Sequence, residues 1–179
     1  MKKILYLVIS ILLFTGCTEL SNTPTKRVEE FFKKYQTLDN DVLNDLDQII
    51  TQDVTLNATQ QEDYRTVMKK HYQNLTYEIK EETIDGDRAT VTAEIAVTDL
   101  NRVMDESENY MNNNIQEFFD ESGNYSISMY NDYRLGQLKM AKEKVKYTVY
   151  LNLSLQNDEW VMDDIDQVTY DKINGTYNY

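Results

Sequence analysis

The sequence has few of the residues that most often carry catalytic or metal chemistry. Its 179 residues include one cysteine, one histidine and one proline. A chain with one cysteine forms no internal disulfide, so the stability of its folded part must come from its core. A site built on several histidines is excluded, and no glycine-rich turn presents a serine nucleophile to the single histidine. We therefore predict no bound metal and no cofactor.

Basic residues are also scarce. Lysine and arginine together number 18 against 31 aspartates and glutamates, which gives a formal net charge of −13. An acidic body of this kind repels nucleic acid and anionic lipid headgroups. We therefore expect no nucleic-acid partner, and we expect that the protein surface alone does not hold the chain at a membrane.

The N-terminus has the layout of a secretory signal peptide. Met1-Lys2-Lys3 is followed by residues 4–14, which are almost entirely apolar, and then by Thr15-Gly16-Cys17. This order gives a basic region, an apolar region and small residues at a cleavage point. The apolar run is also shorter than the roughly 20 residues that span a bilayer as a helix. The sequence therefore favours a cleaved signal over a transmembrane helix.

The five residues Leu13-Phe14-Thr15-Gly16-Cys17 resemble the lipobox of bacterial lipoproteins, although Phe14 stands where that family prefers leucine. The resemblance implies that the Cys17 thiol receives a diacylglyceryl group and that cleavage makes Cys17 the first residue. A palmitate-type lipid anchor on the extracytoplasmic face of the cell membrane follows from it. Two acyl chains anchor a protein stably, whereas one chain holds it only marginally.

The rest of the chain reads as one domain. Apolar residues at helical spacing predict helices that begin at Pro24, after Asp39 and at Thr59. Alternating segments on either side of Asp85-Gly86-Asp87 predict a β-hairpin. Helical spacing returns over 99–119 and 126–143, and a second hairpin is predicted from strands at 145–155 and 160–170. The predicted organisation is a signal peptide at 1–16, a lipidated tether at 17–23, one α+β domain at 24–172 and a loose tail at 173–179.

Grouped helices followed by antiparallel strands indicate an α+β fold, with N-terminal helices packed on a curved antiparallel sheet. This arrangement resembles the cone-shaped nuclear transport factor 2-like (cystatin-like) domain and the small lipoproteins of Gram-positive bacteria built on it. The segment 24–56, the hairpin at Asp85-Gly86-Asp87 and the closing residues 158–165 carry the resemblance. It implies a pocket on the concave face of the sheet and pairing into a homodimer through the outer face.

Several residues are candidates for a site. The predicted last strand holds Trp160, Met162, Asp163 and Asp164, and strict alternation would point Asp164 inward with Trp160 and Met162. His71 lies on a helical apolar stripe, where it either packs beside Tyr72 or faces a cavity as a general base. Tyr147 is a further candidate for ligand binding. The acidic run at 39–47 lacks the glycine of a calcium loop, so a helix cap and a solvated face are favoured over a metal site.

Two classes of function stay open on the sequence alone. The first is a non-catalytic module that binds a small ligand or an envelope protein near the membrane. The alternative is a small cone-fold enzyme in which Asp164 or His71 acts as a general base in an apolar pocket. We favour the first, because the sequence holds no catalytic signature.

Overall fold

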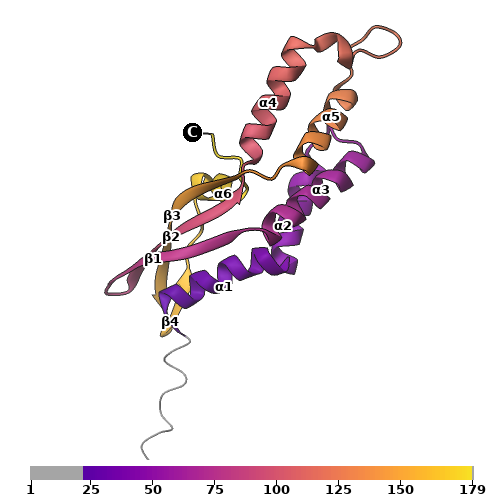
Figure 1. Ribbon diagram of the computed structural model, residues 1–179. Helices are drawn as coiled ribbons and strands as arrows, with labels where there is room; N and C mark the ends of the chain where they lie inside the picture. Colours follow the sequence, from indigo (N-terminus) through magenta and orange to yellow (C-terminus); the bar gives the residue numbers. More distant parts are fainter. Residues whose placement is uncertain (1–21, 179) are drawn as a thin grey trace, which may run out of the picture.

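The computed structural model describes residues 22–178, so Cys17 and the predicted signal peptide lie outside the described residues. Within them the fold is a mixture of six α-helices, one short 3₁₀-helix and a four-stranded antiparallel sheet, as an α+β class predicts (Figure 1). In chain order the elements are α1 (Pro24–Thr37), α2 (Asn40–Gln52), α3 (Ala58–Gln73), β1 (Thr76–Asp85), β2 (Arg88–Thr98), α4 (Leu100–Asn113), η2 (Ile115–Phe118), α5 (Ile127–Met140), β3 (Lys144–Gln156), β4 (Glu159–Met162) and α6 (Gln167–Ile173).

The sheet has one apolar face and one polar face. The strands lie in the order β1-β2-β3-β4, and all neighbours are antiparallel. Every second residue of β2 is buried, and these residues pair with buried residues of β3, for example Val91 with Leu151 and Ala93 with Val149. The opposite face carries polar pairs such as Glu94 and Lys146, whose side chains are 2.8 Å apart. The two-residue period of the sequence thus decides which face is the core.

Helix α1 covers the apolar face of the sheet. Thr23 caps its first turn by accepting a hydrogen bond from the Lys26 backbone N–H, and Pro24 occupies the first helical position. Phe32 is fully buried and stacks on Tyr77 of β1, with ring centroids 4.7 Å apart. The helix runs lengthwise against the sheet (Figure 1). Its apolar stripe and the apolar side of the sheet therefore form one core.

Helices α4 and α5 form an arm that extends beyond the end of the sheet (Figure 1). Buried Gln60 of α3 holds this arm to the body, because its side-chain amide donates to the Ser128 carbonyl at 2.9 Å and to Asp132 at 2.8 Å. Toward the tip, four aromatic rings pack against one another. They belong to Tyr110, Phe118, Tyr130 and Tyr133. The arm is thus an ordered part of the fold with its own small aromatic core.

The first predicted hairpin is confirmed, and the second is confirmed only in part. Gly86 takes the positive φ that its turn requires, at 58°. The predicted return strand over 160–170 was wrong beyond Met162, where β4 ends. Asp166 instead caps α6 by accepting from the Thr169 backbone N–H at 2.6 Å. The hydrogen bond that caps α6 therefore decides the structure here. The apolar–polar alternation of the predicted strand was in any case interrupted at Ile165. The third helix also begins one residue before Thr59, after the cap Asn57.

The expectation of a loose tail beyond Lys172 was also wrong. Ile173 is fully buried, and Asn174 accepts a hydrogen bond from the hydroxyl of buried Tyr72 at 2.8 Å. Gly175 has φ +67°, and a Cβ placed there would lie 2.2 Å from the Thr98 carbonyl oxygen. The last described residues are thus packed between α3 and the end of β2.

The central stacking residue gives a test of this core. Phe32→Ala should lower the free energy of unfolding by roughly 3–5 kcal/mol, because it leaves a cavity between α1 and β1. Urea denaturation followed by the fluorescence of the single tryptophan measures the change. Val54→Ala is the control, because Val54 is 93% exposed and its loss should change stability by less than about 0.5 kcal/mol. Equal effects of the two substitutions would contradict this account of the core.

Candidate functional site

A cavity of about 420 Å³ opens where α3, the end of β2 and the segment between α5 and β3 meet. Its floor is apolar, made by Val67, Leu100, Leu138 and Ala141, and its rim carries Lys70, Lys139, Lys142 and Lys144. His71 also lines it. We call this hollow the lysine cavity. It lies at the end of the sheet where Thr98 of β2 pairs with Lys144 of β3.

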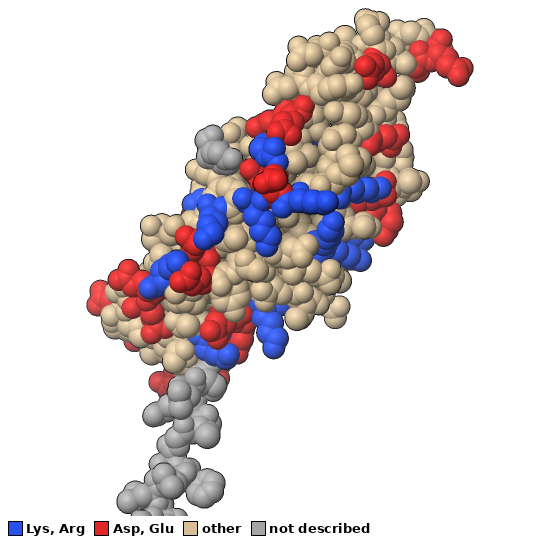
Figure 2. Space-filling view, in the orientation of Figure 1, with Lys and Arg blue, Asp and Glu red and all other residues tan. Residues whose placement is uncertain are grey.

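The four lysines make this region basic in a strongly acidic chain. The Lys139 ammonium pairs with Asp63 at 2.7 Å, and the Lys144 ammonium donates to the Asn74 carbonyl at 2.7 Å. Lys70 and Lys142 are exposed, and among residues 22–178 neither has an acidic partner within ion-pair distance. Figure 2 shows basic side chains gathered across the middle of one face, with acidic side chains toward both ends. An anion is therefore the charge type that this surface attracts.

His71 forms part of the buried wall of the cavity. Its side chain is 2% exposed, its ring lies edge-on to Tyr72, and its Nε2 is 2.8 Å from the Ile173 carbonyl oxygen. Because a carbonyl only accepts, Nε2 carries the hydrogen and Nδ1 is left as an acceptor. Nδ1 is buried and has no hydrogen-bond partner within the described part of the chain. His71 thus packs beside Tyr72 and also reaches the cavity.

Burial controls the protonation of His71. It lowers the pKa of the imidazole to about 4, the Ile173 carbonyl opposes this shift, and the nearby charge of Lys144 adds to it. The ring is therefore neutral at pH 7 and presents a lone pair to its surroundings. The ring therefore adds no charge to the cavity that it lines.

The other predicted site residues do not meet in one place. Trp160 is buried and Met162 half-buried, and both line a second hollow of about 300 Å³ between β4 and α1. Asp164 is exposed, because β4 ends at Met162 and the alternation that would have turned Asp164 inward ends with it. Asp163 is half-buried and accepts from the Ser154 hydroxyl at 2.6 Å. Tyr147 is buried elsewhere, and its hydroxyl donates to the Tyr177 carbonyl at 3.4 Å.

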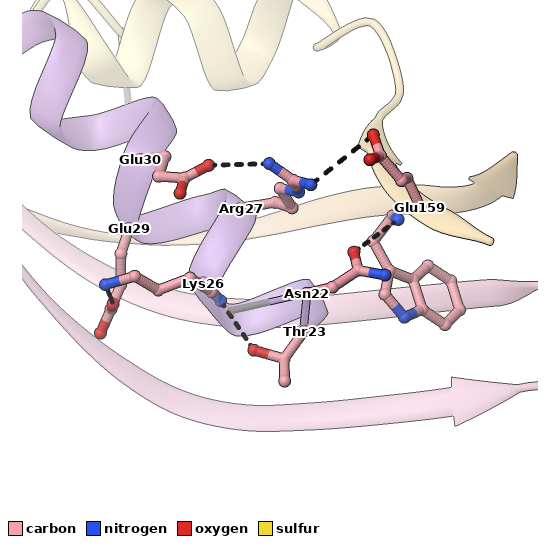
Figure 3. Close-up of polar contacts among 8 residues, drawn as sticks. Asn22, Thr23, Lys26, Arg27, Glu29, Glu30 and Glu159 are labelled. Carbon is pink, nitrogen blue, oxygen red and sulfur yellow. Dashed lines mark hydrogen bonds and ion pairs between the residues drawn. The ribbon is translucent and has the colours of Figure 1, made fainter. Parts of the chain in front are cut away.

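Asn22 fastens the start of α1 to the β3–β4 turn (Figure 3). Its side-chain amide donates to the Asp158 carbonyl at 2.6 Å and accepts from the Trp160 backbone N–H at 3.0 Å. Arg27 of α1 adds an ion pair with Glu159 of β4 at 3.9 Å. We call the two Asn22 hydrogen bonds the Asn22 clamp. The Asn22 clamp lies at the end of the sheet opposite the lysine cavity.

The acidic run at 39–47 takes part in helix capping and surface pairing. Asp39 accepts from the Asp41 backbone N–H at 3.1 Å and caps α2, and Asp47 pairs with Arg65 at 2.7 Å. Within residues 22–178, no three histidine, cysteine or acidic side chains gather in a way that could hold a metal ion. These carboxylates stabilise the helix start and the surface.

Sequence reasoning missed the four lysines of the cavity rim. A signal was present, because residues 139–146 hold four of the chain's 18 basic residues. That density is unusual in a chain with a net charge of −13. The sequence did not show that Lys70, on a helix far earlier in the chain, faces the same hollow.

No known protein family and no curated protein sequence matches the chain. Among solved structures, the crystal structure of ycdA, a candidate lipoprotein from Bacillus subtilis, aligns with a TM-score of 0.46 and 15% sequence identity. The alignment covers 80% of this chain and 47% of that protein, so the chain spans about half the length of ycdA. A likeness this remote identifies neither a family nor an activity.

The buried imidazole predicts a specific pH dependence of stability. The folded state lowers the pKa of His71 from 6.5 to about 4, so the unfolded state binds the proton more tightly. The contribution of neutral His71 to the free energy of unfolding is complete above pH 6.5 and is lost as the pH falls from 6.5 toward 4. At pH 4.5 this one group should cost ~2–3 kcal/mol of folding free energy relative to pH 7.

His71→Gln is the matched variant, because its amide nitrogen can still donate to the Ile173 carbonyl but does not titrate. Urea denaturation at pH 7.0 and 4.5 should show that the wild type loses more stability than the variant. The titration of the carboxylates affects the stability of both proteins equally, so it cancels when the two pH dependences are subtracted. The same pH dependence in both proteins would contradict a buried, neutral His71.

Proposed function

We propose that the chain is a bacterial lipoprotein, held by lipid on Cys17 at the extracytoplasmic face of the cell membrane. Its folded domain acts as a non-catalytic ligand-binding or protein-interaction module. One observation carries this proposal. A cavity of ligand size lies at the end of the sheet opposite the Asn22 clamp, where the anchored segment enters the fold.

The anchor part of the proposal rests on the sequence and on the clamp. Cys17 precedes Asn22 by five residues, a stretch that reaches about 18 Å when fully extended. Across residues 22–178 the helices are all too short or too polar to cross a bilayer. The lipobox-like residues at 13–17 supply the membrane attachment in this proposal. The clamp then keeps the β3–β4 turn close to the lipid.

The cavity would face away from the membrane. Strand β3 runs from Lys144 at the cavity to Gln156 beside the clamped turn, and its 13 residues extend about 40 Å at ~3.3 Å per residue. The α4–α5 arm extends farther in the same direction (Figure 1). A module held in this orientation presents its cavity and its arm to solutes and to envelope proteins.

We also propose that the domain is a variant of the nuclear transport factor 2-like cone. The four-stranded antiparallel sheet with α1 along its apolar face supports this proposal. We further propose that the single domain includes residues 173–178, since Ile173 and Asn174 are buried in it. The C-terminal segment would then close the cone at the end where the lysine cavity opens.

The alternative of an enzyme receives less support from the geometry. Asp164 is exposed in the loop after β4, so it has no apolar surroundings of the kind that turn a carboxylate into a general base. His71 uses one ring nitrogen to hold Ile173, and its other nitrogen is buried. Binding therefore explains the lysine cavity better than proton transfer does.

The lipid anchor predicts a labelling result. Cells that express the full-length chain and are fed an alkyne analogue of palmitate should incorporate the label into the protein. Cys17→Ser should lose the label and leave the membrane fraction, because Cys17 is the only thiol in the chain. Ser10→Ala is the control and should keep the label. Label that persists in Cys17→Ser would overturn the proposed anchor.

The clamp predicts a local change in backbone protection. Asn22→Ala removes the acceptor of the Trp160 backbone N–H and the donor to the Asp158 carbonyl. Amide hydrogen exchange in the peptide that contains Trp160 should become about tenfold faster, as expected when a hydrogen bond worth ~1 kcal/mol is lost. Exchange in β2 should stay unchanged. Unchanged exchange at Trp160 would show that the clamp does not hold the turn.

A further inference from the structure

We propose that the lysine cavity binds a small organic phosphate, a molecule with one phosphate group and a compact apolar body. This inference rests on the proposed binding function and names the class of ligand. It is carried by the rim of lysines, the apolar floor and the position of the cavity on the domain.

The rim favours phosphate over other anions. Four ammonium groups surround the opening, and the residues that line it include no arginine and no acid. An ammonium group is a compact point charge that suits the concentrated charge of a phosphate. Arginine is the residue that matches a planar carboxylate with two parallel hydrogen bonds. In the described part of the chain, Lys70 and Lys142 are the two rim lysines whose ammonium groups have neither an ion pair nor a hydrogen bond, so they can approach a ligand without breaking a bond.

The floor explains why the ligand also needs an apolar body. Val67 and Leu138 are buried beneath the rim, and Leu100 closes the floor from the start of α4. A volume of about 420 Å³ lies within the range of small-molecule sites, roughly 300–1,000 Å³. Inorganic phosphate alone would leave this apolar surface in contact with water. An aromatic or short aliphatic group would cover it.

His71 supplies a second, independent observation. It lines the cavity, is almost fully buried, and keeps a lone pair on Nδ1 without a donor in the described part of the chain. Buried polar atoms are nearly always satisfied, so such an atom points to a missing partner. A phosphate monoester has a second pKa of about 6, so only its singly protonated form, the minority at pH 7, offers a hydroxyl donor to this lone pair.

The position of the cavity favours a dissolved ligand over a lipid headgroup. The clamp lies at the far end of β3, about 40 Å along the strand from Lys144. The tether between Cys17 and Asn22 reaches at most about 18 Å. In the proposed orientation, the rim therefore stands away from the headgroups of the membrane that holds the chain.

Phenyl phosphate is the probe. Calorimetric titration of the full-length protein in dodecyl maltoside should show binding at least tenfold tighter than that of phenol, benzoate or inorganic phosphate. Raising the salt from 50 to 500 mM should weaken this binding, because the rim charges are exposed to solvent. Benzoate binding more tightly than phenyl phosphate would overturn the phosphate assignment and leave a binding module in place.

Single substitutions test the rim. Lys70→Gln and Lys142→Gln should each weaken phenyl phosphate binding about tenfold, the effect of one lost charge-assisted contact of ~1.4 kcal/mol. Lys70→Arg should keep most of the affinity. Lys33→Gln is the matched control, because Lys33 is exposed on α1 and also lies outside ion pairs among the described residues. An equal loss in Lys33→Gln would mean that general charge, and not the cavity, attracts the probe.

Two further measurements separate the sources of phosphate and the two proposals. Protein reconstituted in phosphatidylcholine liposomes should bind phenyl phosphate equally well with and without added phosphatidylglycerol. Weaker binding in the anionic liposomes would reassign the cavity to lipid headgroups. Cys17→Ser protein in detergent should bind the probe normally, so failure of the lipid anchor and failure of the phosphate site give different results.

Discussion

The alternating apolar face of β2 and β3 is the constraint on which the other elements depend. Val91, Ala93, Ile95 and Val97 are all fully buried, and their partners on β3 face the same way. A slip of one residue in the pairing would turn this whole row toward water. Helices α1, α3 and α6 each place apolar side chains against the row. The register between the two central strands therefore also determines where the ends of β2 and β3 meet.

The lysine cavity follows from that register. Thr98 and Lys144 are paired at the end of the sheet, and the chain leaves β2 for α4 there and returns from α5 to β3 at the same place. Helix α3 lines the space between these two connecting segments. Because residues 139–144, from the end of α5 to the start of β3, hold three lysines and α3 adds Lys70, a basic rim forms over an apolar floor. On the face that Figure 2 shows, basic side chains gather across the middle and acidic side chains are most numerous toward the two ends.

Local patterns predicted much of the fold and little of the site. The helices and the first hairpin could be predicted because their apolar periods and the Asp85-Gly86-Asp87 turn are contained in short windows. The strand expected over 160–170 was an error of the same reasoning, since β4 ends at Met162 and Asp166 caps α6. The cavity could not be predicted, because Lys70 and Lys142 meet only after α3 and α5 pack. Asn22 likewise gains its role only from the distant turn at Asp158.

The contact between His71 and Ile173 joins residues 102 positions apart. While the chain is being synthesised, helix α3 emerges from the ribosome long before the segment that completes its surroundings. Until Ile173 and Asn174 have been synthesised, His71 and Tyr72 lack the hydrogen-bond partners that these two residues supply. The apolar surface beside them is then exposed to water. The surroundings of these two side chains are therefore completed only when nearly the whole chain has been made. Once the C-terminal segment has packed, the hydrogen bond between His71 and Ile173 stabilises the folded state against unfolding.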